Sequence, residues 1–171
     1  MNSKTKKIAM GGILTALTVL AVFSASFAPS GKISIYVLAS FFTAISIIHS
    51  DIKFGLLFYI TTSVLSWIVL PNKMAVVPYI GFFGWYGIVK ALIEKLNRRS
   101  LEWIIKIIIM NLVMVAAFFF FQSFLPEIDL SKPWIWPVIL VLLQVIYVIY
   151  DYVFTLIIDY YYRRFYNKFK N

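Results

Sequence analysis

The chain has 171 residues, of which 62% are hydrophobic and 13% are charged, and its formal net charge is +9. A soluble domain is about half apolar and about a quarter charged, so this composition excludes a soluble enzyme and a disordered tail. The cysteine count of 0 also excludes a disulfide scaffold. The apolar residues lie in long blocks, which predicts an all-α polytopic membrane protein with a single domain over residues 1–171.

Hydrophobic blocks bounded by charged residues, proline or glycine predict six membrane-spanning helices. Their expected ranges are about 8–28, 33–48, 52–70, 74–93, 101–125 and 134–160. Pro78 falls near the start of the fourth range, and we expect it to loosen the first turn of that helix because proline donates no backbone hydrogen bond.

The lysines and arginines predict the orientation of these spans. Only Lys32, Lys73 and Lys132 fall on one side of the predicted membrane, whereas the other thirteen of the 16 basic residues fall on the opposite side. Cytoplasmic loops carry the excess of basic residues, so both termini are expected in the cytoplasm of a cell-membrane protein. The net positive charge is therefore interpreted as a topology signal and not as a sign of nucleic-acid binding.

The residues that carry enzyme chemistry are scarce. The chain has no cysteine and one histidine, and it contains no phosphate-binding loop, dinucleotide fingerprint or nucleophile elbow. His49 lies close to Asp51 in a predicted cytoplasmic turn, which fits a solvated pair better than a proton relay. We therefore expect no enzymatic activity, no metal and no cofactor, which leaves binding, transport or scaffolding.

The first span carries small residues at helical spacing. Ala9, Gly12 and Ala16 lie on one face, and Ala21 with Ala25 repeats the spacing further along. Small residues let helix backbones approach closely in lipid. The stripe fits packing within the protein, and it also fits a docking face for another membrane subunit.

Polar side chains inside the spans need partners, because burying them in hydrocarbon is costly. Asn111 and Gln144 fall near mid-depth of the fifth and sixth spans, which predicts an amide–amide hydrogen bond between these helices. Asp151 lies toward the cytoplasmic end of the sixth span, where Lys90 or Lys106 could form an ion pair with it.

A small-molecule pocket that opens outward is predicted among the fourth, fifth and sixth spans. Glycines at 81, 84 and 87 leave a groove on the fourth span, and aromatic side chains flank this groove. The mouth would carry charged residues and indoles of the connector between the last two spans. Packing and plain water exposure are the alternatives. The candidate substrate-binding residues are Tyr79, Trp85, Tyr86, Asn111, Gln122, Gln144, Glu127 and Trp134.

The opening segment resembles one class of membrane proteins. Lys6-Lys7-Ile8-Ala9-Met10-Gly11-Gly12-Ile13-Leu14-Thr15-Ala16-Leu17, a basic start followed by small residues four apart, is similar to the first helix of the substrate-binding S components of energy-coupling factor (ECF) importers. Those subunits share the chain length, six helices and cytoplasmic ends. The short connector 29–32 departs from the longer loop that covers the pocket in many S components.

The resemblance implies a function. The chain would bind a vitamin or another small micronutrient, with membrane lipid around it. Ala9, Gly12 and Ala16 would face the transmembrane coupling subunit, and two ATPase subunits would supply the energy. The alternative is a non-enzymatic scaffold similar to the rod-shape-determining membrane subunits of the cell-wall elongation machinery, which would use its lateral helix faces and need no outer pocket.

Overall fold

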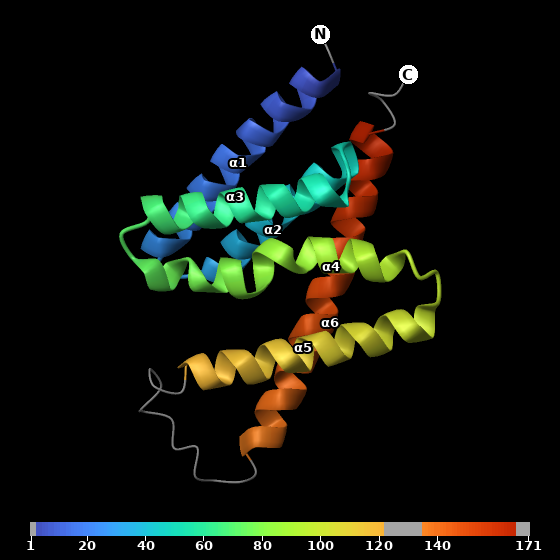
Figure 1. The fold of residues 1–171 in the computed structure, drawn as a ribbon. Helices are drawn as coiled ribbons and strands as arrows, with labels where there is room; N and C mark the ends of the chain where they lie inside the picture. Colours follow the sequence, from blue (N-terminus) through green and yellow to red (C-terminus); the bar gives the residue numbers. More distant parts are fainter. Residues whose placement is uncertain (1–2, 122–134, 167–171) are drawn as a thin grey trace. The chain divides into compact units, whose positions relative to one another are not determined.

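The computed structural model describes residues 3–121 and 135–166, and within these ranges it contains helices and no strand. Figure 1 shows the six long helices, α1 (Ser3–Phe27), α2 (Lys32–His49), α3 (Ile52–Val69), α4 (Gly84–Glu94), α5 (Arg99–Phe121) and α6 (Ile135–Tyr161). Together with the turns before α4, they give six segments long and apolar enough to cross a membrane. The predicted all-α, six-span membrane fold is confirmed.

The chain divides into two compact units, Met1–Trp103 and Ile104–Asn171. The first unit contains α1 to α4, and the second contains most of α5 and all of α6. Each unit is described by itself below. The predicted single domain stays a prediction.

The helix ends in the first unit follow from local chemistry. Gly31 precedes α2 with a φ of 74°, a left-handed conformation that glycine adopts at little cost. Asp51 caps α3, because its carboxylate accepts a 2.7 Å hydrogen bond from the backbone N–H of Phe54. Pro71 follows the last residues of α3 and cannot continue the helix.

The fourth span is not a continuous α-helix. The sequence predicted only a loosened turn at Pro78, and the structure shows a longer irregular segment. It begins with a 3₁₀ turn, η1 (Lys73–Ala75), and continues through a π-helical turn, η2 (Tyr79–Phe83), into α4. Irregular backbone inside a membrane must find hydrogen-bond partners within the protein. Two tyrosines supply them: the Tyr36 hydroxyl donates to the Ala75 carbonyl at 2.6 Å, and the Tyr59 hydroxyl donates to the Ile80 carbonyl at 2.8 Å.

The core of the first unit combines small residues with the broken span. Val22 and Ala25 of α1 pack with Ala39 of α2, with Val76 and with Tyr79, and all five side chains are buried. Buried hydroxyls also lie on α1 and α3. The Thr18 and Thr62 hydroxyls donate to backbone carbonyls one turn earlier, so these groups are satisfied without water.

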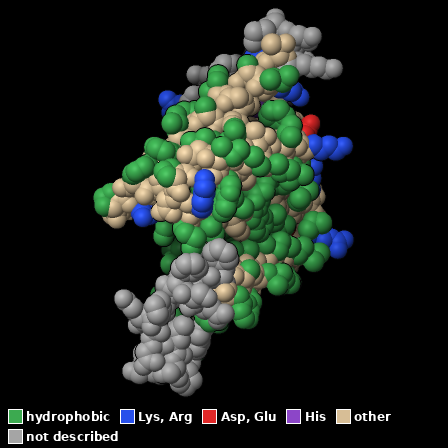
Figure 2. Space-filling model, turned by 60° about the vertical axis from the view of Figure 1, so that its left-hand side comes forward, with side chains coloured by type: hydrophobic (Ala, Val, Ile, Leu, Met, Phe, Trp, Pro, Cys, Tyr) green, Lys and Arg blue, Asp and Glu red, His purple; other side chains and the backbone are tan. Residues whose placement is uncertain are grey.

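Large apolar side chains cover the outside of both units. Figure 2 shows hydrophobic side chains over much of the visible face. Ile8 and Ile68 in the first unit, and Leu112 and Val141 in the second, are each more than 60% exposed. Such surfaces are unfavourable in water and are expected where lipid is the solvent.

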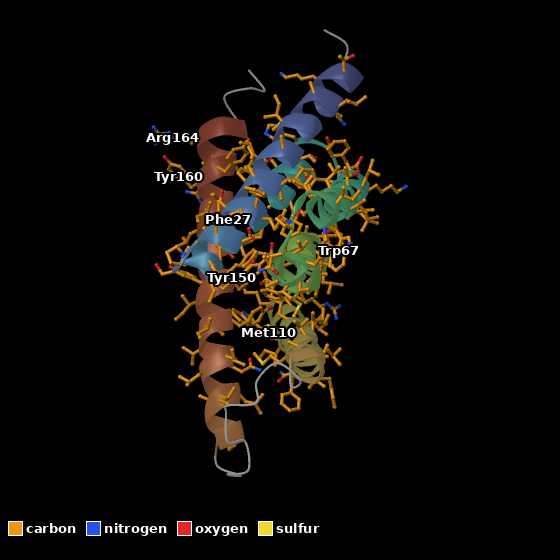
Figure 3. The ribbon with its side chains drawn as sticks, turned by 90° about the vertical axis from the view of Figure 1, so that its left-hand side faces the viewer. Phe27, Trp67, Met110, Tyr150, Tyr160 and Arg164 are labelled. Atoms are coloured by element: carbon orange, nitrogen blue, oxygen red, sulfur yellow. The ribbon has the colours of Figure 1, made fainter. Side chains whose placement is uncertain are left out.

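The second unit holds a buried ion pair between its two helices. Lys106 of α5 donates to both carboxylate oxygens of Asp151 on α6, at 2.9 and 3.1 Å, and neither residue is more than 6% exposed. Figure 3 follows α6 from Tyr150 to Tyr160, near its end, and Arg164 lies in the π-helical turn η4 (Tyr162–Tyr166) that continues it. The Arg164 guanidinium donates to the Tyr160 hydroxyl and lies 5.5 Å from the ring centroid.

Candidate functional site

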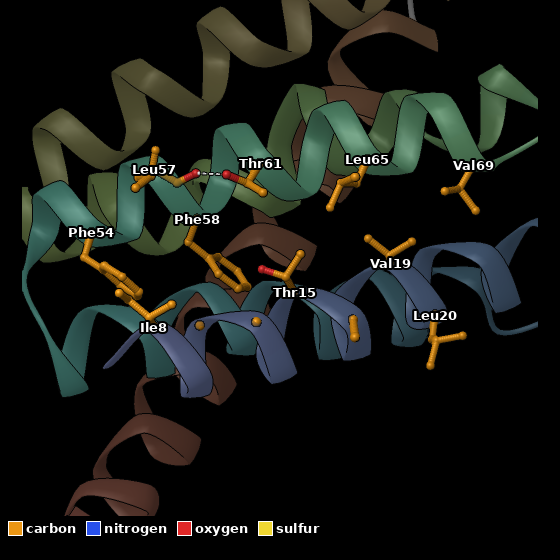
Figure 4. A pocket seen from close by; sticks show the side chains of 13 residues that line it. Ile8, Thr15, Val19, Leu20, Phe54, Leu57, Phe58, Thr61, Leu65 and Val69 are labelled. Carbon is orange, nitrogen blue, oxygen red and sulfur yellow. Dashed lines mark hydrogen bonds between the residues drawn. The ribbon is translucent and has the colours of Figure 1, made fainter. Parts of the chain in front are cut away.

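A groove of about 810 Å³ runs between α1 and α3 within the first unit. One wall carries Thr15, Ala16 and Val19 of α1, and the other carries Phe58 and Leu65 of α3. Figure 4 shows the Phe58 ring and the Thr15 side chain approaching from opposite walls. The lining is almost entirely apolar, so the groove is suited to hydrocarbon or to an apolar helix face and not to a polar solute.

The small residues of α1 separate into two groups. Ala21 and Ala25 are buried, and Ala25 packs with Ala39 of α2, so this part of the stripe serves packing within the chain. Ala9, Gly12 and Ala16 are exposed, and Gly12 and Ala16 lie at the groove. A Cβ added at Gly12 would meet no described atom within 4 Å. The packing of the described residues therefore does not require glycine at position 12.

Gly11 has a different role, which the sequence did not separate from that of Gly12. A Cβ at Gly11 would lie 2.7 Å from Cζ of Phe54. The missing side chain lets the Phe54 ring lie against α1, where the ring lines the groove. Two adjacent glycines thus perform different tasks, one in packing and one at an open surface.

Three of the predicted pocket residues lie in the first unit, where they contribute to packing. Tyr79 is fully buried, and its hydroxyl lies 2.8 Å from the Thr62 hydroxyl. Tyr86 is buried in α4 and packs against Phe82, with ring centroids 5.2 Å apart. The Trp85 indole donates at 2.8 Å to the Gly81 carbonyl one turn earlier. Their role in binding a solute stays a prediction.

The predicted amide pair of the second unit is not formed. The Asn111 amide donates at 2.8 Å to the Ile107 carbonyl in its own helix. The described side chains contain no hydrogen bond between Asn111 and Gln144, although both residues are half-buried. The carbonyl one turn earlier gives one N–H of the Asn111 amide a partner within α5. Gln122, Glu127 and Trp134 lie outside the described residues.

Asp151 was expected to pair with Lys90 or Lys106, and the structure confirms the ion pair with Lys106. Lys90, the other expected partner, pairs with Glu94 one turn later at 2.7 Å. A lysine and a carboxylate inside a membrane remain charged only if they neutralise each other, because burying an isolated charge is far more costly. The pair therefore links α5 to α6, and neither charge can be removed alone without leaving the other buried.

The described residues contain no group of three or more side chains that could hold a metal ion. No family model, no curated protein and no solved structure matches the chain. The candidate site therefore rests on its geometry: an apolar groove with exposed small residues on one wall.

Proposed function

We propose that this chain is a non-enzymatic membrane subunit that docks on another transmembrane protein through the exposed small residues of α1. The supporting observation is the position of Gly12 and Ala16, which are exposed at a groove within the first unit. Small residues at an exposed position in lipid allow a second helix to approach closely. The resemblance of the opening segment to S components supports the coupling subunit of an ECF importer as the proposed partner.

The finer proposal is that the chain is the substrate-binding S component of such an importer in the cell membrane. It would bind a vitamin or a similar micronutrient, and two ATPase subunits would drive uptake. This proposal rests on the six spans and on the likeness of residues 6–17. The scaffold of the cell-wall elongation machinery is the second candidate, because Tyr79 and Tyr86 fill the core and a lateral groove is open.

The docking proposal is tested by co-purification. We expect Gly12→Leu and Ala16→Leu to reduce recovery of the co-expressed coupling subunit about tenfold or more, because loss of close packing that costs about 1.4 kcal/mol changes an equilibrium tenfold. Ala116→Leu is the matched control, since Ala116 is an exposed alanine of α5 and is not among the residues that line the groove. Wild-type recovery with both α1 variants would contradict the proposal.

Substrate binding is tested by mass spectrometry of small molecules that the purified protein retains. If the chain is an S component, we expect the purified protein to retain a compound and the Gln144→Leu variant to lose it. The thermal unfolding midpoint of this variant should equal that of the unaltered protein. Val141→Ala is the control, because Val141 is exposed on the same helix. A protein that retains no compound yet still docks a membrane partner would favour the scaffold.

The orientation is tested by labelling single cysteines introduced into the chain. With both termini in the cytoplasm, Lys32→Cys and Lys132→Cys should react with a membrane-impermeant maleimide added to intact cells. Lys53→Cys and Lys95→Cys should react only after the membrane is opened. The reverse pattern would mean that both termini lie outside.

A further inference from the structure

The groove between α1 and α3 matches the hydrocarbon of one membrane leaflet in length. Along α1 its lining runs from Ile8 to Leu20, which corresponds to about 18 Å at the helical rise of about 1.5 Å per residue. The hydrocarbon of one leaflet is about 15 Å thick. An extended acyl chain that enters from one leaflet can therefore lie along the whole groove.

The groove offers an acyl chain an apolar surface with little unsatisfied polarity. The Thr61 hydroxyl on the α3 wall donates at 2.8 Å to the Leu57 carbonyl in its own helix, as Figure 4 shows. The space beside Gly12 is open, because a Cβ there would contact no described atom within 4 Å. Hydrocarbon can fill this space without breaking a hydrogen bond.

Positive charge lies at one end of the groove. Ile8 and Phe54 line this end, and Lys7 and Lys53 immediately precede them in the sequence. Lys6, Lys7 and Lys53 are all exposed, so their flexible side chains can extend to the membrane surface. The nearby carboxylate of Asp51, which caps α3, supplies one negative charge against these three lysines. A phosphate at this end would therefore meet a net positive charge.

We propose that an anionic phospholipid occupies the groove when no partner subunit is docked, with one acyl chain between α1 and α3 and its phosphate beside Lys6, Lys7 and Lys53. This regulation rests on the proposed function, because lipid and partner would compete for the surface at Gly12 and Ala16. Docking would then require the lipid to leave, so the abundance of anionic lipid would tune assembly.

In the test, the full chain is reconstituted in nanodiscs of equimolar phosphatidylglycerol and phosphatidylcholine and then purified out of them. The lipid that stays bound to the protein is measured. We expect the retained lipid to be enriched in phosphatidylglycerol. The triple variant Lys6→Gln/Lys7→Gln/Lys53→Gln should lower this enrichment about tenfold, since each basic residue near a membrane surface attracts anionic lipid. The control Lys95→Gln/Arg98→Gln/Arg99→Gln removes the same charge elsewhere and should leave the enrichment unchanged. An equal loss in both triple variants would overturn the site.

A second variant tests the contribution of the groove to lipid retention separately from that of the three lysines. Thr61→Trp places an indole in the groove from the α3 wall and leaves Gly12 and Ala16 intact, so retention of either lipid should fall. Unchanged retention would contradict acyl-chain binding in the groove. Lipid retention is measured without the coupling subunit, so its failure is distinguishable from failed docking, which the Gly12→Leu and Ala16→Leu variants report.

Discussion

Removing one partner of the buried ion pair should destabilise the second unit more than any other single substitution proposed for this chain. Lys106→Met leaves the Asp151 carboxylate, and Asp151→Leu leaves the Lys106 ammonium, without the partner that lies 2.9 Å away. The expected loss is about 3–5 kcal/mol in the free energy of unfolding, because an uncompensated charge remains buried. Thermal unfolding in one detergent, followed by circular dichroism, measures the difference.

The double variant Lys106→Met/Asp151→Leu tests whether the two side chains contribute to stability as a pair or independently of each other. With both charges replaced by apolar groups of similar size, the unfolding free energy should return to within about 1 kcal/mol of the starting value. Additive losses in the double variant would mean that each side chain depends on different neighbours and that the pair does not act as a unit.

Gly84→Ala should destabilise the first unit by about 1–3 kcal/mol, the range expected for overpacking a filled core. The new Cβ would lie 2.7 Å from the Tyr59 ring and 2.9 Å from the Tyr79 carbonyl oxygen, which the backbone holds in place. The Tyr59 ring cannot move away freely, because its hydroxyl donates to the Ile80 carbonyl.

Gly81→Ala is the matched control for this substitution. A Cβ at Gly81 would meet no described atom within 4 Å, so the unfolding midpoint should stay unchanged or rise slightly. If both alanine variants unfold at the same temperature, the close approach of Tyr59 to Gly84 does not limit stability.

The fold could be predicted from the sequence because the relevant signals are long and repeated. Apolar blocks of membrane-spanning length identified six spans, and the ends of α2 and α3 lie within one residue of those expected. The broken fourth span was only partly foreseen. Pro78 indicates a loosened turn, but the 3₁₀ and π turns depend on tyrosines from two other helices.

The candidate site was harder to predict from the sequence, because residue spacing alone does not show which partner a small or polar residue contacts. Gly12 and Ala25 belong to the same stripe, yet Gly12 is exposed and Ala25 is buried. Asn111 donates to a carbonyl of its own helix, which helical spacing permits as readily as a bond to Gln144. The ion-pair partner of Asp151 was easier to predict, because a buried carboxylate needs a cation and few lysines lie at its depth.

Site-specific crosslinking tests most directly whether this chain docks through α1. The chain has no cysteine, so Gly12→Cys, Ala16→Cys and Ala116→Cys each introduce a single attachment point for a photoreactive maleimide. In membranes that contain the coupling subunit, positions 12 and 16 should crosslink to that subunit and position 116 should not. Crosslinking from position 116 alone, or equally from all three positions, would contradict docking through the exposed small residues of α1.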